Sequence, residues 1–163
     1  MSLPSRQFSR ALSAPALAAA PVLIALMTLV VLMAGGNGAM AQQILAPLRA
    51  LEMAHDGQVT IIDIRRPDEW RKTGIPTGAE RATVRFSRGT ARFLRRIAEL
   101  TNGDKSKPIA LICAAGVRSK HASRLLRNRG YTRVMDISEG MLGNARGVGW
   151  LRRDLPVSRC KGC

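Results

Sequence analysis

Aromatic and acidic residues are both scarce in this chain. Only 4% of the 163 residues are Phe, Trp or Tyr, whereas 46% are hydrophobic, so we expect a core of aliphatic side chains. Lys and Arg number 26 against 11 Asp and Glu, which gives a formal net charge of +15. This balance predicts attraction to anions, whether small oxyanions, acidic partners, membrane surfaces or nucleic acid.

Metal-ligating residues are few as well, with three Cys and two His. The terminal Cys160-Lys161-Gly162-Cys163 supplies only two of the four ligands that a structural zinc site usually has. His55 and His121 lie at no spacing that is typical of a metal site. We therefore expect no metal and no cofactor. The glycine-rich segment 35–38 has no strand before it, so it is not a dinucleotide-binding loop.

Residues 1–41 differ from the rest of the chain. They hold two Arg and no acid, then an uncharged apolar run, Ala16–Ala34, and then the small-residue site Ala39-Met40-Ala41. These are the three parts of a secretory signal peptide. The alternative is an uncleaved membrane anchor, because the run has about the 20 residues that cross a bilayer. Pro21 and the small-residue site favour cleavage.

Either alternative places residues 42–163 outside the cytoplasm, in the periplasm or secreted, or held at the membrane by the anchor. This part keeps 24 of the basic side chains and all 11 acidic ones, a charge of +13. Since an exported protein meets little nucleic acid, we expect no nucleic-acid partner. Small anionic substrates and anionic lipid head groups remain as expected partners.

Strands alternate with helices through the rest of the chain. The apolar, β-branched runs Val59–Ile64, Pro108–Cys113 and Arg133–Ile137 predict buried parallel strands. This alternation predicts an α/β fold, a central parallel sheet flanked by helices on both faces, over residues 42–157, followed by a short tail at 158–163. We expect helices over Ile44–Ala54, Arg66–Lys72, Gly89–Gly103, Arg118–Gly130 and Glu139–Asn144, a loop over Thr73–Glu80 and a short strand at Ala82–Phe86.

One cysteine lies where a predicted strand meets a predicted helix, in Cys113-Ala114-Ala115-Gly116-Val117-Arg118-Ser119. Ligands of parallel sheets bind beyond the carboxyl ends of the strands, which is where Cys113 lies. The N–H groups of such a turn, the helix N-terminus and the permanent charge of Arg118 favour an anion, and hence a nucleophilic thiolate. Gly116 allows a backbone conformation closed to other residues. The alternative is a buried structural thiol.

Five segments of the chain resemble the rhodanese family of sulfurtransferases, and the resemblance extends from about Leu45 to Val157. It implies a compact α/β fold around a parallel sheet and a persulfide on Cys113 as the catalytic intermediate. Asp63 and Arg65 match the family's first signature. The segments are VTIIDIRRPDEW, GIPTGA, CAAGVRSKHASRLLRNRGY, VMDISEGMLGN and GWLRRDLPV. The chain departs from the family at Gly74–Ala79, which lacks a His that many members carry and holds an additional Thr.

The expected reaction has two half-reactions with a covalent intermediate. The Cys113 thiolate takes the outer sulfur of thiosulfate or of another persulfide donor, and cyanide or a thiol then removes it. We expect the loop amides and Arg118 to hold the persulfide and Arg118 to orient the donor's sulfonate. Ser119 caps the following helix or hydrogen-bonds the persulfide, and we favour the cap. Asp63 and Arg65 are expected to form a structural ion pair near the loop.

A Cys-based phosphatase or arsenate reductase is the rival enzyme class, because cell-cycle tyrosine phosphatases resemble rhodaneses in fold. Their loop is Cys-x5-Arg, whereas here Arg118 is the fifth residue after Cys113. The shorter loop predicts room for one sulfur atom and too little room for a phosphate. The loop also contains no acid that would protonate a leaving group. We expect His121 to be an exposed polar residue and not a general base.

The remaining two cysteines have two interpretations. A disulfide between Cys160 and Cys163 leaves Cys113 free to react, and it is the interpretation we favour. The alternative is a dithiol that accepts or resolves the sulfur carried by Cys113. The basic surface likewise predicts either a solvated face or a non-catalytic binding module that docks on an acidic protein or an anionic membrane.

Overall fold

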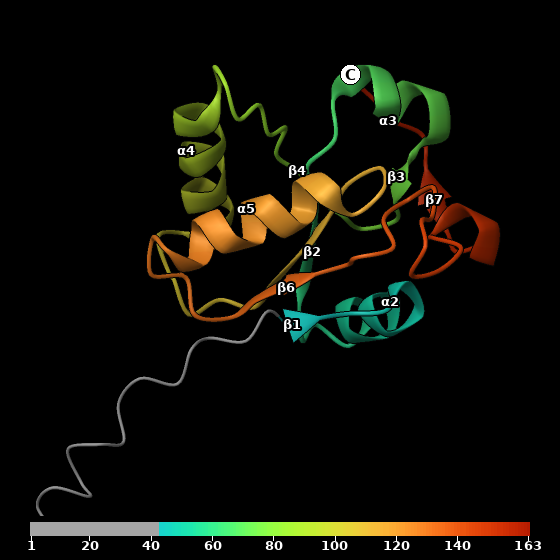
Figure 1. Cartoon of the computed structure of the whole chain (residues 1–163), viewed down its shortest axis with the longest axis horizontal. Coiled ribbons are helices and arrows are strands. Elements are labelled where there is room, and N and C mark those ends of the chain that lie inside the picture. The colour runs from blue at the N-terminus through green and yellow to red at the C-terminus, as the bar shows by residue number, and fades with distance from the viewer. Residues whose placement is uncertain (1–42) are drawn as a thin grey trace, which may run out of the picture. The chain divides into compact units, whose positions relative to one another are not determined.

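A five-stranded parallel sheet forms the centre of residues 43–163, the residues that the computed structural model describes (Figure 1). The leader predicted over residues 1–41 lies outside the described residues. Neighbouring strands follow the order β1-β6-β5-β2-β4, and every pair is parallel. The strands are β1 (Gln43–Ile44), β2 (Thr60–Asp63), β4 (Glu80–Arg81), β5 (Ile109–Ile112) and β6 (Val134–Asp136).

Strand β5, at the centre of the sheet, is apolar because both faces of the sheet are covered. All four residues of β5 are buried, as expected for a parallel strand that packs against helices on each side. β2 and β5 pair over their whole length, from Thr60 opposite Ile109 to Asp63 opposite Ile112. Both strands therefore end at the same edge, and the chain continues from Ile112 directly into Cys113.

Helices cover both faces of the sheet, so the predicted α/β fold is confirmed (Figure 1). Helix α4 (Thr90–Thr101) and helix α5 (Val117–Arg127) pack on one face, where Phe93, Ile97 and Leu126 are buried. Helix α2 (Pro47–His55) packs on the other face together with the segment around Trp150. Among residues 43–163, no helix combines the length and the apolar character needed to cross a membrane.

Two elements predicted from the sequence have wrong boundaries. Ile44 belongs to β1, and α2 begins only at Pro47, where proline is favoured in the first turn. The strand predicted at Ala82–Phe86 is displaced to Glu80–Arg81, so it begins at the last residue of the segment predicted as a loop. The N–H of Ala82 still binds the carbonyl of Asp63 at 3.1 Å, so contact with β2 continues beyond the regular ladder.

The helix predicted at Glu139–Asn144 is also wrong, because this segment forms a series of turns. Gly140 has a φ of +69°, a left-handed conformation that ends helical geometry. An ideal Cβ on Gly140 would lie 2.6 Å from the carbonyl oxygen of Ala114. The glycine therefore allows residues 138–144 to pack directly against the loop that follows β5.

The C-terminal segment returns to the region after helix α3 (Pro67–Thr73). A short 3-10 helix at Leu151–Arg153 precedes β7 (Val157–Ser158), which pairs antiparallel with β3 (Ile75–Pro76). Neither short strand is predicted by the sequence, since two residues give no periodic pattern. The β3–β7 pair holds the end of the chain beside α3, near the edge where β2 and β4 end (Figure 1).

Candidate functional site

The thiol of Cys113 lies between the end of β5 and the start of α5. Cys113 is 1% exposed and is the free cysteine of the chain. Its Sγ accepts the backbone N–H of Ser119 at 3.4 Å and contacts the Ser119 hydroxyl at 3.5 Å. That hydroxyl donates to the carbonyl of Gly116 at 3.1 Å. Gly116 is the N-cap residue, so the cap expected of Ser119 is wrong, and Ser119 binds the sulfur from the first turn.

Residues 141–144 turn back over the Cys113 loop and bind its first three carbonyl oxygens. The bonds are Met141 N to Cys113 O (2.9 Å), Leu142 N to Ala114 O (2.9 Å) and Asn144 Nδ2 to Ala115 O (3.0 Å). No hydrogen bond within residues 43–163 uses the N–H groups of residues 114–118. The loop therefore has its acceptors occupied and its donors available, which suits an anion.

Gly116 sets the closest approach between the loop and the segment opposite. It has a φ of +80°, and an ideal Cβ there would lie 1.9 Å from the carbonyl oxygen of Ser138. Asn144 holds the same oxygen of Ser138 through its Nδ2 at 2.7 Å. A side chain at position 116 would therefore push the two segments apart and change the shape of the loop.

The guanidinium of Arg118 binds the carboxylate of Glu69 on α3 through both terminal nitrogens, at 2.8 and 2.5 Å. Burial opposes ionisation of Glu69, but hydrogen bonds from Arg118 and from the N–H of Arg66 outweigh it, so the pKa of Glu69 lies below its ordinary value. The hydrogen bond to Glu69 likewise raises the pKa of Arg118. Glu69 thus caps α3 and anchors the start of α5 at the same time.

Asp63 and Arg65 form a buried ion pair at the carboxyl end of β2, with Nη2 of Arg65 and Oδ2 of Asp63 2.7 Å apart. Their side chains are 0% and 1% exposed. Arg65 also donates to the Thr73 hydroxyl and to the carbonyl of Gly74, both at 2.7 Å. The pair therefore joins β2 to the end of α3 and has the geometry of a structural ion pair.

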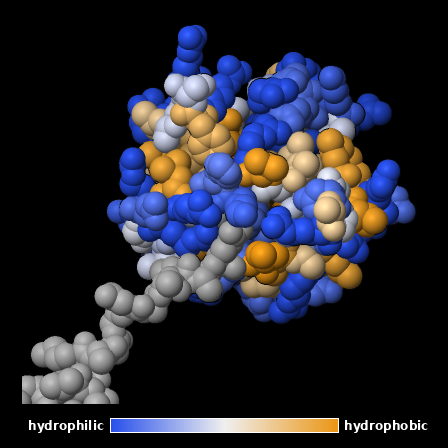
Figure 2. Space-filling model, in the orientation of Figure 1, coloured by the Kyte–Doolittle hydropathy of each residue, from blue (hydrophilic) through white to orange (hydrophobic). Residues whose placement is uncertain are grey.

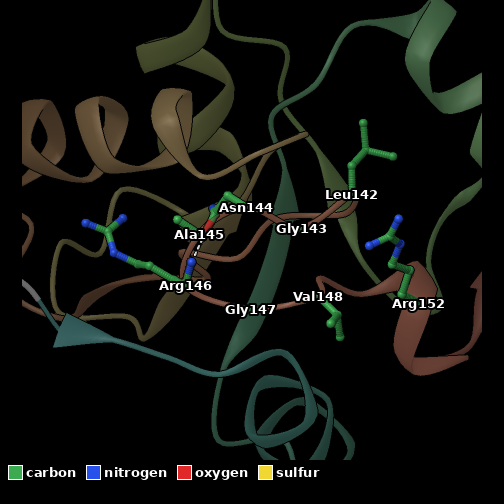
Figure 3. Close-up of a pocket in the computed structure, with 8 residues that line it drawn as sticks. All are labelled: Leu142, Gly143, Asn144, Ala145, Arg146, Gly147, Val148 and Arg152. Carbon is green, nitrogen blue, oxygen red and sulfur yellow. Dashed lines mark hydrogen bonds between the residues drawn. The ribbon is translucent and has the colours of Figure 1, made fainter.

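A pocket of about 530 Å³ is lined by residues 142–148 and Arg152 (Figure 3). Arg146 and Arg152 lie on opposite sides of the view in Figure 3. Cys113 does not line it, so this pocket is not the place where sulfur would react. Within the described part of the chain, no group of three or more His, Cys, Asp or Glu is placed to hold a metal ion.

Polar and charged side chains cover most of the face seen in Figure 2, with apolar patches between them. Val117 lies in the Cys113 loop and is 67% exposed. Leu142, whose N–H binds the carbonyl of Ala114, is 53% exposed. Exposed apolar side chains therefore lie in and next to the loop that holds the buried thiol.

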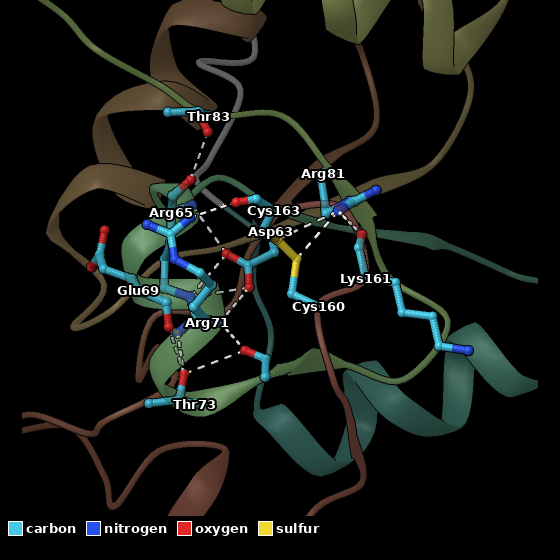
Figure 4. The surroundings of a disulfide bond; sticks show 11 residues. Asp63, Arg65, Glu69, Arg71, Thr73, Arg81, Thr83, Cys160, Lys161 and Cys163 are labelled. Carbon is cyan, nitrogen blue, oxygen red and sulfur yellow. Dashed lines mark hydrogen bonds and ion pairs between the residues drawn. A yellow bond between two sulfur atoms is a disulfide. The ribbon is translucent and has the colours of Figure 1, made fainter.

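Cys160 and Cys163 form a disulfide, with their Cα atoms 5.8 Å apart. Figure 4 shows the disulfide beside the Arg81 side chain, close to the Asp63–Arg65 pair. In the structure the terminal pair of cysteines is joined and Cys113 is free.

Two residues that shape the loop were missed from the sequence, Glu69 and Asn144. The spacing Arg66-Pro67-x-Glu69 signals a helix start with a capping carboxylate, which places Glu69 in α3. Nothing in the sequence connects it to Arg118, 49 positions later. Asn144 carries no signal, because its partners become neighbours only when the turns at 138–144 fold over the loop.

Comparison with known proteins gives the same fold. A protein from Rickettsia prowazekii, the uncharacterized RP600, is 30% identical over 98 residues, which cover 59% of this chain and 80% of that protein. The polysulfide-sulfur transferase homodimer of Wolinella succinogenes superposes with a TM-score of 0.57 at 22% identity, over 86% of this chain and 92% of that one. RPA3614 of Rhodopseudomonas palustris, described as a possible tyrosine phosphatase, superposes with a TM-score of 0.53 at 22% identity, over 72% and 86%.

The model of one protein family matches more than half of the chain. The matched residues are 46–144, which contain β2, β5 and β6, helices α2 to α5 and the Cys113 loop, and the family is the rhodanese-like domain. The chain therefore belongs to the rhodanese-like domain family.

Proposed function

We propose that this chain is a sulfurtransferase that carries sulfane sulfur as a persulfide on Cys113. The observation that carries the proposal is the loop itself. A free thiol accepts the N–H of Ser119, and the neighbouring carbonyls bind residues 141–144, which leaves further N–H groups for a negative charge. Hydrogen-bond donors around a cysteine favour the thiolate, which is the nucleophile.

In the first half-reaction, the Cys113 thiolate attacks the outer sulfur of thiosulfate. The new S–S bond forms as the bond between the two sulfurs of thiosulfate breaks, and sulfite leaves with the electron pair. The loop amides and the N–H of Ser119 stabilise the negative charge of the persulfide. In the second half-reaction, cyanide or a thiol attacks the outer sulfur and regenerates the Cys113 thiolate, a sequence with a covalent intermediate.

We propose a different part for Arg118 from the one expected from the sequence. Since both of its terminal nitrogens bind Glu69, we assign it to positioning the start of α5 and not to clamping the donor's sulfonate. The burial of Cys113 limits the donor to one that delivers a small outer sulfur, and the small side chains of Ala114 and Ala115 leave room for it.

Fold alone does not choose between sulfur transfer and phosphate hydrolysis, because proteins described in both ways share this fold. The loop argues for sulfur transfer. Arg118 is the fifth residue after Cys113, so the loop is one residue shorter than a Cys-x5-Arg loop. The arginine that would hold a phosphate is also occupied by Glu69.

We also propose that the enzyme acts outside the cytoplasm, because residues 1–41 have the three parts of a signal peptide. The excess of basic residues in the rest of the chain would attract anionic donors such as thiosulfate.

The test is thiosulfate:cyanide turnover of the wild type, Cys113→Ser and His121→Ala. His121 lies on the same helix and is exposed, so its variant controls for unspecific effects of substitution in α5. We expect wild-type and His121→Ala activity to agree within about twofold and Cys113→Ser to be inactive. Intact mass after thiosulfate treatment should show one added sulfur, removable by reductant, only where Cys113 is present.

Two results would overturn the proposal. Hydrolysis of an aryl phosphate that depends on Cys113 would make the chain a phosphatase. Absence of persulfide and turnover with every sulfur donor, together with salt-sensitive retention of an acidic protein or anionic vesicles, would make it a binding module.

A further inference from the structure

The terminal disulfide is held in a defined place and does not hang from a free tail. Residues Val157–Ser158 pair with Ile75–Pro76, and the hydroxyls of Thr77 and Ser158 are 3.1 Å apart. Cys160 and Cys163 are both partly buried, and the Cys163 carbonyl accepts from Arg71 on α3. These contacts therefore hold the two sulfurs of the disulfide in one position.

A cation lies against both sulfurs at that position (Figure 4). Nη1 of Arg81 is 3.2 Å from Sγ of Cys160 and 3.5 Å from Sγ of Cys163. The Arg81 guanidinium also lies over the ring of Trp70, 5.9 Å from its centroid. The carbonyl of Arg81 accepts from Arg96 at 3.2 Å, which fixes the residue at the edge of the sheet. A cation stabilises a neutral disulfide only slightly, whereas it strongly stabilises a negatively charged thiolate.

The disulfide closes a loop of only four residues at the end of the chain. Cross-links stabilise a fold mainly by restricting the unfolded chain, and they do so least for the shortest loops. Stability therefore accounts poorly for a disulfide that is docked on a cation.

The Cys113 loop and the Cys160–Cys163 pair both lie at the edge of the sheet formed by the carboxyl ends of its strands. Ile112, which precedes Cys113, is opposite Asp63, and Asp63 is opposite Arg81. Since neighbouring strands are about 4.8 Å apart, the backbone positions of Ile112 and Arg81 are about 10 Å apart. Helix α3 contacts both centres, the start of α5 through Glu69, which binds Arg118, and the tail through Arg71, which binds the carbonyl of Cys163.

We propose that Cys160 and Cys163 are a second reactive site, a dithiol that takes the sulfane sulfur from the Cys113 persulfide and releases it as hydrogen sulfide. The inference rests on the proposed function of Cys113. A thiolate of the pair, stabilised by Arg81, attacks the outer sulfur, and the Cys113 thiolate leaves. The other thiol then attacks the persulfide just formed, closes the disulfide and expels hydrosulfide.

The electrons balance within the chain. The sulfane sulfur gains two electrons and becomes sulfide, while the two thiols lose two electrons and become the disulfide. An external dithiol must reduce the disulfide before the next cycle, and dithiothreitol serves as this reductant in the test.

The first experiment is a single turnover. Wild type and a Cys160→Ser/Cys163→Ser double variant are reduced with dithiothreitol, desalted without oxygen and mixed with one equivalent of thiosulfate. We expect the wild type to release about one equivalent of hydrogen sulfide and to lose two hydrogen atoms in mass. The double variant should retain one added sulfur on Cys113 and release none.

The outcomes separate the two proposals. If the wild type keeps the sulfur on Cys113 while both terminal thiols stay reduced, the second site is refuted and the sulfurtransferase stands. If neither protein gains sulfur from any donor, the proposed function fails, and the inference is overturned with it.

The second experiment tests the role of Arg81 directly in a Cys113→Ser background. Reduced protein is alkylated with iodoacetamide at pH 7, and Arg81→Gln is compared with Arg85→Gln, an exposed arginine just after β4. We expect Arg81→Gln to slow the alkylation of the terminal thiols about fivefold, because a contacting cation lowers the pKa of a thiol by about one unit or less at a partly exposed site. Equal rates in the two variants would refute the assignment.

Discussion

Replacement of Gly116 by alanine should disorganise the reactive loop at a cost that follows from its geometry. A side chain in the left-handed region costs about 1–2 kcal/mol. The added Cβ would lie 1.9 Å from the carbonyl oxygen of Ser138, a backbone atom that cannot move without the segment around it. Overpacking of this kind costs about 1–3 kcal/mol more. We therefore expect a loss of about 2–5 kcal/mol, which leaves a typical domain folded or marginally folded.

Gly57→Ala is the matched control. Gly57 has a φ of +70°, but nothing lies within 4 Å of the position its Cβ would take, so this variant carries the backbone strain without the contact. In urea unfolding followed by circular dichroism, Gly116→Ala should have a midpoint lower by about 1–3 M, given a slope of about 1.5 kcal/mol per M. Gly57→Ala should shift it by less than half of that and keep thiosulfate:cyanide turnover. Equal midpoints and equal turnover in the two variants would show that the approach to Ser138 does not shape the loop.

Three further substitutions have expected outcomes. Glu69→Gln should destabilise the fold by about 1–2 kcal/mol at pH 7, between the values for exposed and buried pairs. Because folding lowers the pKa of Glu69, the stabilisation from its ionised carboxylate is complete above the unfolded pKa of about 4.3 and is lost as the pH falls through the folded pKa. The urea midpoints of wild type and variant should therefore converge on acidification. Asp63→Asn should cost about 3–5 kcal/mol in the same assay, since it leaves a buried guanidinium without its charge partner, and an unchanged midpoint would contradict a structural ion pair. Cys160→Ser with Cys163→Ser should cost at most about 2 kcal/mol by thermal unfolding, and a larger loss would assign the disulfide a mainly structural role.

The central sheet and the Cys113 loop could be predicted because local patterns specify them. The β-branched runs around β2, β5 and β6 have no polar face, and only a sheet covered on both sides accommodates such strands. The cysteine, the glycine three positions later and the following helix pattern are contiguous in the sequence, so their chemistry is visible without a structure.

The contacts that hold the loop in shape could not be predicted, because they join distant segments. Glu69 and Arg118 are far apart in the sequence, and either could have paired with a nearer residue of opposite charge. The sequence predicts a helix at Glu139–Asn144, which contains the good helix formers Met141 and Leu142, but packing of Gly140 against Ala114 overrides that propensity. The strands β3 and β7 gain their structure from each other and not from their own residues.

The carbonyl bonds made by residues 141–144 have a consequence for the order in which the Cys113 loop gains its contacts. These residues follow β6 in the sequence, so during synthesis or refolding the Cys113 loop emerges well before the segment that binds its carbonyls. Until residues 141–144 pack against the loop, the carbonyls of residues 113–115 lack these hydrogen-bond partners. A chain that is still unfolded, or that is truncated before residue 141, therefore lacks the hydrogen bonds that hold the carbonyls of the Cys113 loop.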